Sequence, residues 1–413
     1  MSDRRTFMRQ VLEGSTAMAV AGFIPTGRVL GANDRVRFGL IGAGGRGQAI
    51  FKAAIKAPNT EAVAVADLYT RRLDEAKAIA PGVKTYSDFR RLLDDKTIDA
   101  VLIATPQHQH ALNFVPAIQA GKDVYQEKTM AFTPDHARRM RKAFESSNRV
   151  VQIGIQSLSG IGYTRVLELA TPERMGDVTA VHTHAYRNAP YGGWKRPIPA
   201  DCDTAHVDWK AFEGEAEPRA FDPNRYMNWR FYWDYSGGNV YENFVHQVGF
   251  WHKVLGLEIP PSVTMAGNNY RNPGMELPDT MEVAMDYEKK ILFSWSSMFG
   301  NRHYGEQFDL LLGTKGTILR DEDENIRYVP EGRKHVPESM QTSGGEASAP
   351  DVVGAGDATD DHMRNFFDCV RSRKEPNASF DIGYKSAIAC QMCNLSYRLK
   401  RTVHWDPQLM DIV

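Results

Sequence analysis

The sequence has almost no net charge, and this absence excludes partners that are held by bulk electrostatics. Its 413 residues include 50 basic and 51 acidic side chains, which give a formal net charge of −1. Nucleic acid and anionic membrane surfaces are bound through a basic field, which this chain does not have. We therefore expect neither nucleic acid nor a membrane surface as a partner.

Cysteines are few, and the histidines form no recognisable metal-binding pattern. Cys390 and Cys393 are spaced as C-x-x-C, but they lie in residues 384–400, whose periodicity is helical. Cysteines three apart on a buried helix face are more typical of small hydrophobic residues than of a redox or metal site. The 12 histidines are scattered, and the pairs at 108/110 and 182/184 have no evident third ligand. The sequence predicts no metal site.

Long apolar runs are also missing, since a membrane-spanning helix needs about 20 such residues. The weakly apolar residues 14–24 are too few, and they follow Arg4 and Arg5 in the pattern of a twin-arginine export signal. Residues 1–32 are therefore predicted to be a signal read by the twin-arginine export machinery, cleaved after Ala21 or near Ala32. The mature protein would be periplasmic and have no membrane span. If the signal is not functional, residues 1–32 form a basic helix and the protein is cytoplasmic.

What the sequence does contain is a regular alternation of strands and helices in its first half. Apolar strand patterns at 36–41, 61–66, 83–86, 100–104, 123–126 and 150–155 alternate with helical patterns at 48–56, 70–80, 87–94, 109–120 and 134–147. This order predicts an α/β fold with a doubly wound parallel sheet, a Rossmann domain over residues 33–156. The length of the chain leaves room for a second domain.

A glycine-rich loop follows the first predicted strand directly. It reads Gly42-Ala-Gly44-Gly45-Arg46-Gly47 and leads into a helix. In a G-x-G-x-x-G loop the three glycines serve a tight turn, close approach to a pyrophosphate and helix packing, and the helix N-terminus attracts the phosphates. A plain glycine-rich turn is the alternative for such a motif alone. Here the strand, the loop and the helix together favour a dinucleotide site.

An acidic residue ends the second predicted strand, as a dinucleotide site requires. Asp67 lies twenty residues after Gly47, where a carboxylate accepts hydrogen bonds from the ribose hydroxyls and repels a 2′-phosphate. We therefore predict NAD as the cofactor and regard NADP as less favoured, although the nearby Arg71 and Arg72 weaken that preference.

Polar residues follow the other predicted strands at the edge where ligands bind in such sheets. Thr105, Lys128 and Gln156 lie at or just beyond strand ends. A solvated lysine is the ordinary interpretation of Lys128. The functional one is a proton-transfer or hydroxyl-positioning group beside a nicotinamide, whose positive charge would lower the lysine pKa.

These motifs together resemble the glucose–fructose oxidoreductase and inositol dehydrogenase family, known as Gfo/Idh/MocA. The resemblance rests on the glycine loop, on Thr105-Pro106 with His110, on Glu127-Lys128, and on stretches at 207–209, 228–230, 234–238 and 362–407. It adds Pro106, His110 and Glu127 to the expected cofactor contacts. It also implies a second domain over 157–413, a mainly antiparallel open sheet that covers the cofactor and forms homo-oligomers, with helices in 360–400 packing back. Strand patterns at 262–266, 280–287, 291–297, 308–312 and 317–320 fit that sheet, and residues 336–359 read as a surface loop.

The resemblance also implies the catalytic residues. Lys128 matches the lysine of an E-K-P motif, with Thr129 in place of the proline. Glu242 and His246 match a D-x-x-x-H motif, with Glu in place of Asp, and their i, i+4 spacing predicts that the carboxylate orients the imidazole. A plain buried histidine is the alternative for His246. The expected sugar contacts are His184, Tyr186, Arg187, Asn188 and Tyr232, together with His182.

The expected function is hydride transfer from a secondary hydroxyl-bearing carbon of a sugar or glycoside to a tightly bound NAD. Because soluble NAD is not supplied outside the cytoplasm, an exported enzyme would have to carry its cofactor and regenerate it in place. One alternative is a redox-neutral NAD-dependent glycoside hydrolase of the kind that the resemblance includes. A non-catalytic sugar or NAD sensor is a remote alternative.

Overall fold

A computed structural model describes residues 34–303, 305–323, 325–332 and 358–413. The predicted signal segment at 1–32 and almost all of the predicted loop at 336–359 lie outside these residues. The described chain contains two sheets, the first a six-stranded parallel sheet in the order β3-β2-β1-β4-β5-β6. The second has nine strands in the order β13-β12-β11-β7-β10-β9-β8-β14-β15. The predicted fold class is confirmed.

The first sheet consists of short buried strands connected by helices. Its strands are β1 (Val36–Ile41), β2 (Thr60–Ala66), β3 (Lys84–Tyr86), β4 (Ala100–Ile103), β5 (Asp123–Gln126) and β6 (Val151–Ile153). The helices between them are α2 (Gly45–Lys56), α3 (Thr70–Ile79), α4 (Phe89–Leu93), α5 (His110–Gln119) and α6 (Pro134–Glu145). Strands buried on both faces have continuous apolar sequences, because helices cover each side. For this reason the alternation of strands and helices could be predicted from the sequence.

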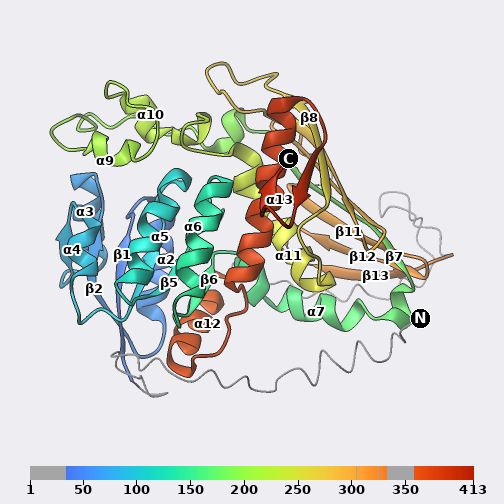
Figure 1. The fold of residues 1–413 in the computed structure, drawn as a ribbon, viewed down its shortest axis with the longest axis horizontal. Helices are drawn as coiled ribbons and strands as arrows, with labels where there is room; N and C mark the ends of the chain where they lie inside the picture. Colours follow the sequence, from blue (N-terminus) through green and yellow to red (C-terminus); the bar gives the residue numbers. More distant parts are fainter. Residues whose placement is uncertain (1–33, 304, 324, 333–357) are drawn as a thin grey trace, which may run out of the picture.

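A helix from the other end of the chain completes one face of this sheet. Helix α12 (Thr359–Ser372) packs on α2, and its Phe366 and Phe367 join Phe38 of β1 in one buried cluster. Figure 1 shows α12 below the parallel sheet, beside the first strands of the chain. The Rossmann core is therefore built from residues more than 300 positions apart.

The second sheet is mostly antiparallel and is covered on one face by helices. It contains β7 (Val178–Tyr186), β8 (Ser262–Asn268), β9 (Thr280–Tyr287), β10 (Ile291–Met298), β11 (Gln307–Gly313), β12 (Gly316–Asp321), β13 (Ile326–Pro330), β14 (Val403–Asp406) and β15 (Asp411–Ile412). One pair, β7 with β10, is parallel. Helices α11 (Val245–Leu255) and α13 (Phe380–Leu399) lie against it, and α7 (Ile161–Leu169) and α8 (Pro172–Met175) precede it. Cys390 and Cys393 are free and fully buried in α13.

Between β7 and α11 the chain leaves the sheet and crosses to the Rossmann domain. We call residues 196–231 the cap segment; it includes α9 (Trp209–Glu213), α10 (Pro223–Met227) and the short helix η4 (Trp229–Phe231). Figure 1 shows α9 and α10 above the ends of the parallel strands. Aromatic side chains of the cap segment, including Trp209 and Phe212, pack in one buried cluster with Tyr235, which follows the segment. Among the described residues, no helix has the length and hydrophobicity needed to span a membrane.

Candidate active site

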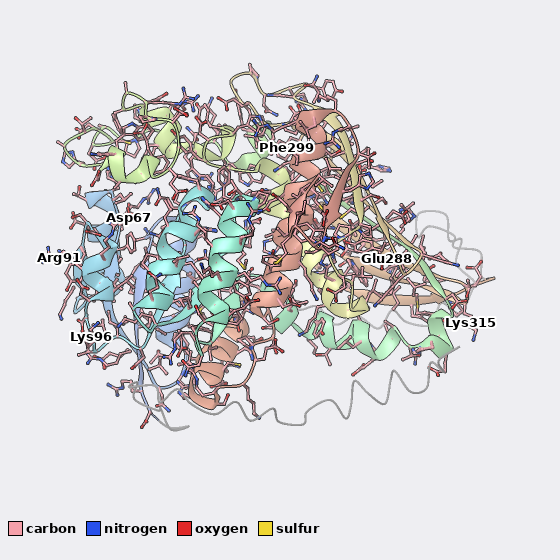
Figure 2. All side chains as sticks on the ribbon, in the orientation of Figure 1. Asp67, Arg91, Lys96, Glu288, Phe299 and Lys315 are labelled. Carbon is pink, nitrogen blue, oxygen red and sulfur yellow. The ribbon has the colours of Figure 1, made fainter. Side chains whose placement is uncertain are left out.

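A cavity of about 780 Å³ lies between the carboxyl ends of the Rossmann strands and the cap segment. Its Rossmann side includes seven predicted cofactor contacts: Gly42, Gly44, Gly45, Arg46, Asp67, Thr105 and Pro106. The cap segment contributes residues from Arg196 to Arg230. Figure 2 shows Asp67 at the upper end of the Rossmann domain, below the cap segment. The remaining predicted contacts, Gly47, His110, Glu127, Lys128 and Gln156, do not line this cavity.

The glycine loop has the geometry that a dinucleotide requires. Gly42 has a φ of +90°, and a Cβ there would lie 2.8 Å from the backbone of Ala104 and Thr105. At Gly47 a Cβ would lie 1.9 Å from the Gly42 carbonyl oxygen, so α2 packs directly on the loop. At Gly44 and Gly45 a Cβ would meet nothing within 4 Å. The loop thus leaves open space at the N-terminus of α2, where backbone N–H groups favour phosphate.

Asp67 holds the glycine loop as well as lining the cavity. Its carboxylate accepts hydrogen bonds from the N–H of Ala43 at 2.6 Å and of Tyr69 at 2.9 Å. Burial raises the pKa of Asp67, and the two backbone hydrogen bonds oppose that effect. The two arginines near Asp67 both have acidic partners. Arg71 binds Asp201 at 2.7 Å, and Arg72, which lines the cavity, binds Glu75 at 2.7 Å.

Three predicted contacts outside the cavity support its walls. The Glu127 carboxylate accepts hydrogen bonds from Arg46 at 2.8 Å, from Tyr125 at 3.2 Å and from Gln156 at 3.3 Å, and so connects the glycine loop to the ends of β5 and β6. The ring nitrogens of His110 contact the carbonyl oxygens of Thr105 at 2.9 Å and of Thr129 at 2.7 Å. Burial lowers the pKa of His110, so the neutral ring donates to only one of these two carbonyls.

Lys128 and Glu242 form a buried ion pair where the two domains meet. Lys128 Nζ donates to Glu242 Oε2 at 2.8 Å. Gln107 Nε2 donates to Glu242 Oε1 at 2.8 Å, and Arg230 Nε lies 3.1 Å from the same oxygen. Side-chain exposure is 13% for Lys128 and 7% for Glu242, so the pair is largely removed from water. The peptide between Lys128 and Thr129 is cis.

The helix that carries Glu242 differs from the one that the i, i+4 spacing assumed. Residues Val240–Phe244 form a π-helical turn, η5, and the regular helix α11 begins at Val245. A π turn has i, i+5 hydrogen bonds and rotates the side chains around the helix axis. Within the described chain, the hydrogen-bond and ion-pair partners of the Glu242 carboxylate are Lys128, Gln107 and Arg230, rather than His246.

The surroundings of the cluster lower the pKa values of both Glu242 and His246. Burial would raise the pKa of Glu242, but the charges of Arg230 and Lys128 lower it to about 2. Burial, and then the charges of Lys128 and Arg46, lower the pKa of His246 well below 6.5. At neutral pH the site therefore contains a carboxylate and an uncharged imidazole that is able to accept a proton.

The predicted sugar contacts are not brought together at this cluster. Alternate residues of β7 face opposite ways, with Val181, Thr183 and Ala185 buried toward the helices. His184 and Tyr186, and His182 beyond them, lie on the opposite face, where the rings of His184 and Tyr186 stack at 4.2 Å. This placement directs them away from Lys128, because α11 and η5 cover the other face.

The other three predicted sugar contacts come directly after β7 or directly after the cap segment. Arg187 donates to Asn243 Oδ1 at 3.2 Å and so reaches the π-helical turn. Asn188 forms a bridge with Gly300. Tyr232 is 8% exposed, and its ring packs under Arg225.

Sequence reasoning did not single out Gln107 and Arg230 as site residues. Arg230 lines the cavity and also contacts Glu242, so it joins the cofactor cavity to the ion pair. Both residues lie in or beside stretches that carried the resemblance, Thr105-Pro106 and Asn228-Trp229-Arg230. Their positions in or beside those motifs were the sequence feature from which they could have been predicted as site residues.

Comparison with known proteins decides the family. A model described as "Oxidoreductase family, NAD-binding Rossmann fold" matches residues 36–155, and its companion, "Oxidoreductase family, C-terminal alpha/beta domain", matches residues 210–404. The chain belongs to the Gfo/Idh/MocA oxidoreductase family. NAD is its cofactor, and sugar-type dehydrogenases are among its relatives.

Relatives within the family differ in what their names say they do. The chain is 31% identical over 305 residues to an inositol 2-dehydrogenase/D-chiro-inositol 3-dehydrogenase of Shouchella clausii, covering 72% of this chain and 76% of that protein. It is 34% identical over 140 residues to a glycosyl hydrolase family 109 protein of Stenotrophomonas maltophilia, but this match spans only 31% of either protein. A levoglucosan dehydrogenase solved with NADH shares the fold, with a TM-score of 0.68 at 17% identity over 90% of this chain and 99% of that one.

Proposed function

We propose that this protein is an NAD-dependent oxidoreductase that acts on a secondary hydroxyl of a sugar or glycoside and keeps its cofactor tightly bound. The proposal rests on the position of Arg230. This residue lines the dinucleotide cavity and also contacts the Lys128–Glu242 ion pair. The reacting groups of the protein therefore adjoin the cavity that would hold the cofactor. The inositol dehydrogenase relative supports a polyhydroxylated substrate.

The residues of the cluster have separable roles in this proposal. When bound, NAD⁺ accepts the hydride from the carbinol carbon of the substrate. His246, uncharged at neutral pH, is the acceptor for the hydroxyl proton. Lys128, held by Glu242, donates a hydrogen bond to the substrate oxygen. Glu242 thus acts as the positioning residue of Lys128 rather than of His246.

A second candidate is supported by the family 109 hydrolase relative. In this scheme, oxidation at C3 of a glycoside makes the C2 proton acidic, and its removal allows the aglycone to be eliminated. Water then adds to C1, and the hydride returns to C3, so no net oxidation occurs. The same residues could serve both reactions, since each begins with hydride removal from a secondary carbinol.

Tight binding, export and oligomerisation remain parts of the proposal that rest on different observations. Walls from both domains around the cavity support tight binding. The twin-arginine pattern at Arg4 and Arg5 supports export to the periplasm. The outer face of the nine-stranded sheet, which α11 and α13 leave uncovered, is the surface we assign to a homo-oligomer.

The test combines cofactor content with product analysis on an aryl glycoside. We expect the purified protein to release NAD(H) on denaturation, and a protein with no bound NAD and no affinity for it would contradict the proposal. Free aglycone without net NADH would indicate hydrolysis, whereas a keto-glycoside would indicate dehydrogenation. His246→Ala and Lys128→Ala should lower turnover by about 10²–10⁴-fold while NAD stays bound.

A further inference from the structure

We propose that Asp201, in the second domain, fastens the cap segment over the adenosine end of the cofactor cavity and thereby makes cofactor release slow. This inference rests on the proposed function, because it assumes a dinucleotide in that cavity. It assigns retention of the cofactor to a specific contact between the two domains, which we call the clasp: residues 201–208 against residues 68–71.

The backbone part of the clasp is a short antiparallel pairing between the domains. Tyr69 and Val207 form an isolated β-bridge. The N–H of Thr70 donates to the carbonyl oxygen of His206 at 3.0 Å, and the N–H of Asp208 donates to that of Leu68 at 2.9 Å. The loop after β2 and the cap segment are thus joined by hydrogen bonds in both directions.

The side-chain part of the clasp converges on Asp201. Its carboxylate accepts from the Tyr69 hydroxyl at 2.7 Å, and from Arg71 through Nε at 2.9 Å and Nη2 at 2.7 Å. Hydrogen bonds from Arg71 and then Tyr69 lower the pKa of Asp201 to about 2. Bidentate guanidinium–carboxylate contacts are the more specific kind of charged hydrogen bond.

Of the two contacts to Asp201, the hydrogen bond from Tyr69 contributes more to holding the clasp closed than the ion pair with Arg71, because Tyr69 is buried. Tyr69 has no exposed surface and packs with Cys202 and Val207, and Tyr226 of the cap segment contacts its ring edge-on at 5.8 Å. Burial, and then Asp201, raise the pKa of its hydroxyl to about 12. Removal of Asp201 would leave a buried hydroxyl without its acceptor, which is costly, whereas the exposed Arg71 side chain can turn to water.

The clasp is directly connected to the walls of the cavity. On the Rossmann side, the N–H of Tyr69 donates to Asp67, which lines the cavity. On the cap side, Asp208, Lys210 and Tyr226 line it. The cap segment is also fixed farther along, where Gln109 Nε2 donates to the Phe212 carbonyl oxygen at 2.6 Å. With that inner contact in place, opening the clasp is the movement that uncovers the adenosine end.

The test measures how fast the holoprotein loses NAD⁺ after dilution into an excess of a distinguishable NAD analogue. We expect release to be about tenfold faster in Asp201→Ala and Tyr69→Phe, as the loss of one buried hydrogen bond implies. Asp201→Glu, which keeps the carboxylate, should restore slow release. Because Tyr69 and Asp201 act through one bond, the double variant should release NAD⁺ no faster than Asp201→Ala.

Glu217→Ala is the matched control, since Glu217 is an exposed acidic residue of the cap segment that lies outside the clasp. It should release NAD⁺ at the wild-type rate. The clasp is overturned if Asp201→Ala also releases at that rate while folded by circular dichroism, or if Glu217→Ala accelerates release equally. Absence of bound NAD from the wild-type protein would instead overturn the proposed function.

Discussion

At the scale of single residues, Glu242 links the chemistry of the site to its stability. Its carboxylate is 7% exposed and faces two cations, Lys128 and Arg230. A buried charge is tolerated only when it is paired and hydrogen-bonded, and the remaining acceptor capacity of Glu242 is used by Gln107. Both carboxylate oxygens of Glu242, which replaces the aspartate of the family motif, therefore have partners: Oε2 accepts from Lys128, and Oε1 contacts Gln107 and Arg230.

Replacing Glu242 with glutamine should affect both turnover and stability. The variant leaves Lys128 without its anion, and we expect kcat to fall at least tenfold and the free energy of unfolding to fall by about 3 kcal/mol at pH 7. The folded-state pKa of about 2 lies below the ordinary 4.5, so this stabilisation is present above pH 4.5 and is lost as pH falls toward 2. Urea unfolding at several pH values measures it. Glu242→Asp should retain most of the pH dependence, and equal pH dependence of Glu242→Gln and wild type would contradict the assignment.

His246 should determine the acidic side of the pH–rate profile. A general base must be unprotonated, and the pKa of His246 is lowered well below 6.5 by burial and by the charges of Lys128 and Arg46. We therefore expect kcat/KM to stay constant through pH 6.5 and to fall only at lower pH. A profile with an acidic midpoint at or above 6.5 would show that His246 does not act as the base in this environment.

At the scale of elements, the π-helical turn and the glycine loop show how backbone geometry sets side-chain roles. The sequence spacing of Glu242 and His246 suggested one helical face, but η5 changes that relation and directs Glu242 to Lys128. No local sequence signal distinguishes a π turn from an α turn here. The glycine loop, by contrast, could be predicted from the sequence, because its glycines follow a buried strand and precede a helix.

The glycine loop allows cofactor binding to be separated from folding. Gly44 has a φ of −65°, and a Cβ there would meet no protein atom within 4 Å, so Gly44→Ala should leave the Tm of the cofactor-free protein unchanged. The added methyl group would occupy the approach of the pyrophosphate, and we expect the Kd for NAD⁺ to rise at least tenfold. Calorimetric titration measures this change.

Gly42→Ala is the contrasting variant. At a φ of +90° and 2.8 Å from the backbone after β4, the alanine should destabilise the cofactor-free protein itself by about 1–3 kcal/mol. Equal Tm values for the two variants would contradict the distinction between the cofactor-facing and packing glycines.

At the scale of the whole molecule, the Rossmann domain does not end where its last strand ends. Phe367 of α12 is fully buried, and its ring lies 5.3 Å from that of Phe38 in β1. The C-terminal part of the chain is thus needed to complete the first core.

Phe367→Ala should therefore destabilise the Rossmann domain although the substitution lies near the C-terminus. A buried Phe→Ala change costs about 3–5 kcal/mol, and we expect a lower Tm together with faster hydrogen exchange in β1. Tyr270→Ala, at a side chain that is 69% exposed, is the control and should leave both unchanged. Loss of protection confined to α12 would show that the first core is independent of it.

The sequence alone determined the elements of the Rossmann domain, the glycine loop and the position of Asp67 at the end of the second strand, because these signals are local: buried strands have continuous apolar runs, and turns need glycine. The tertiary structure decided what depends on contacts distant in sequence. It directed Glu242 to Lys128 instead of His246, turned His184 and Tyr186 away from the ion pair, brought Arg230 to the cofactor cavity, and joined Arg71 to Asp201. No local pattern encodes the contacts of Glu242, Arg230 and Arg71, since each arises from the packing of one domain against the other.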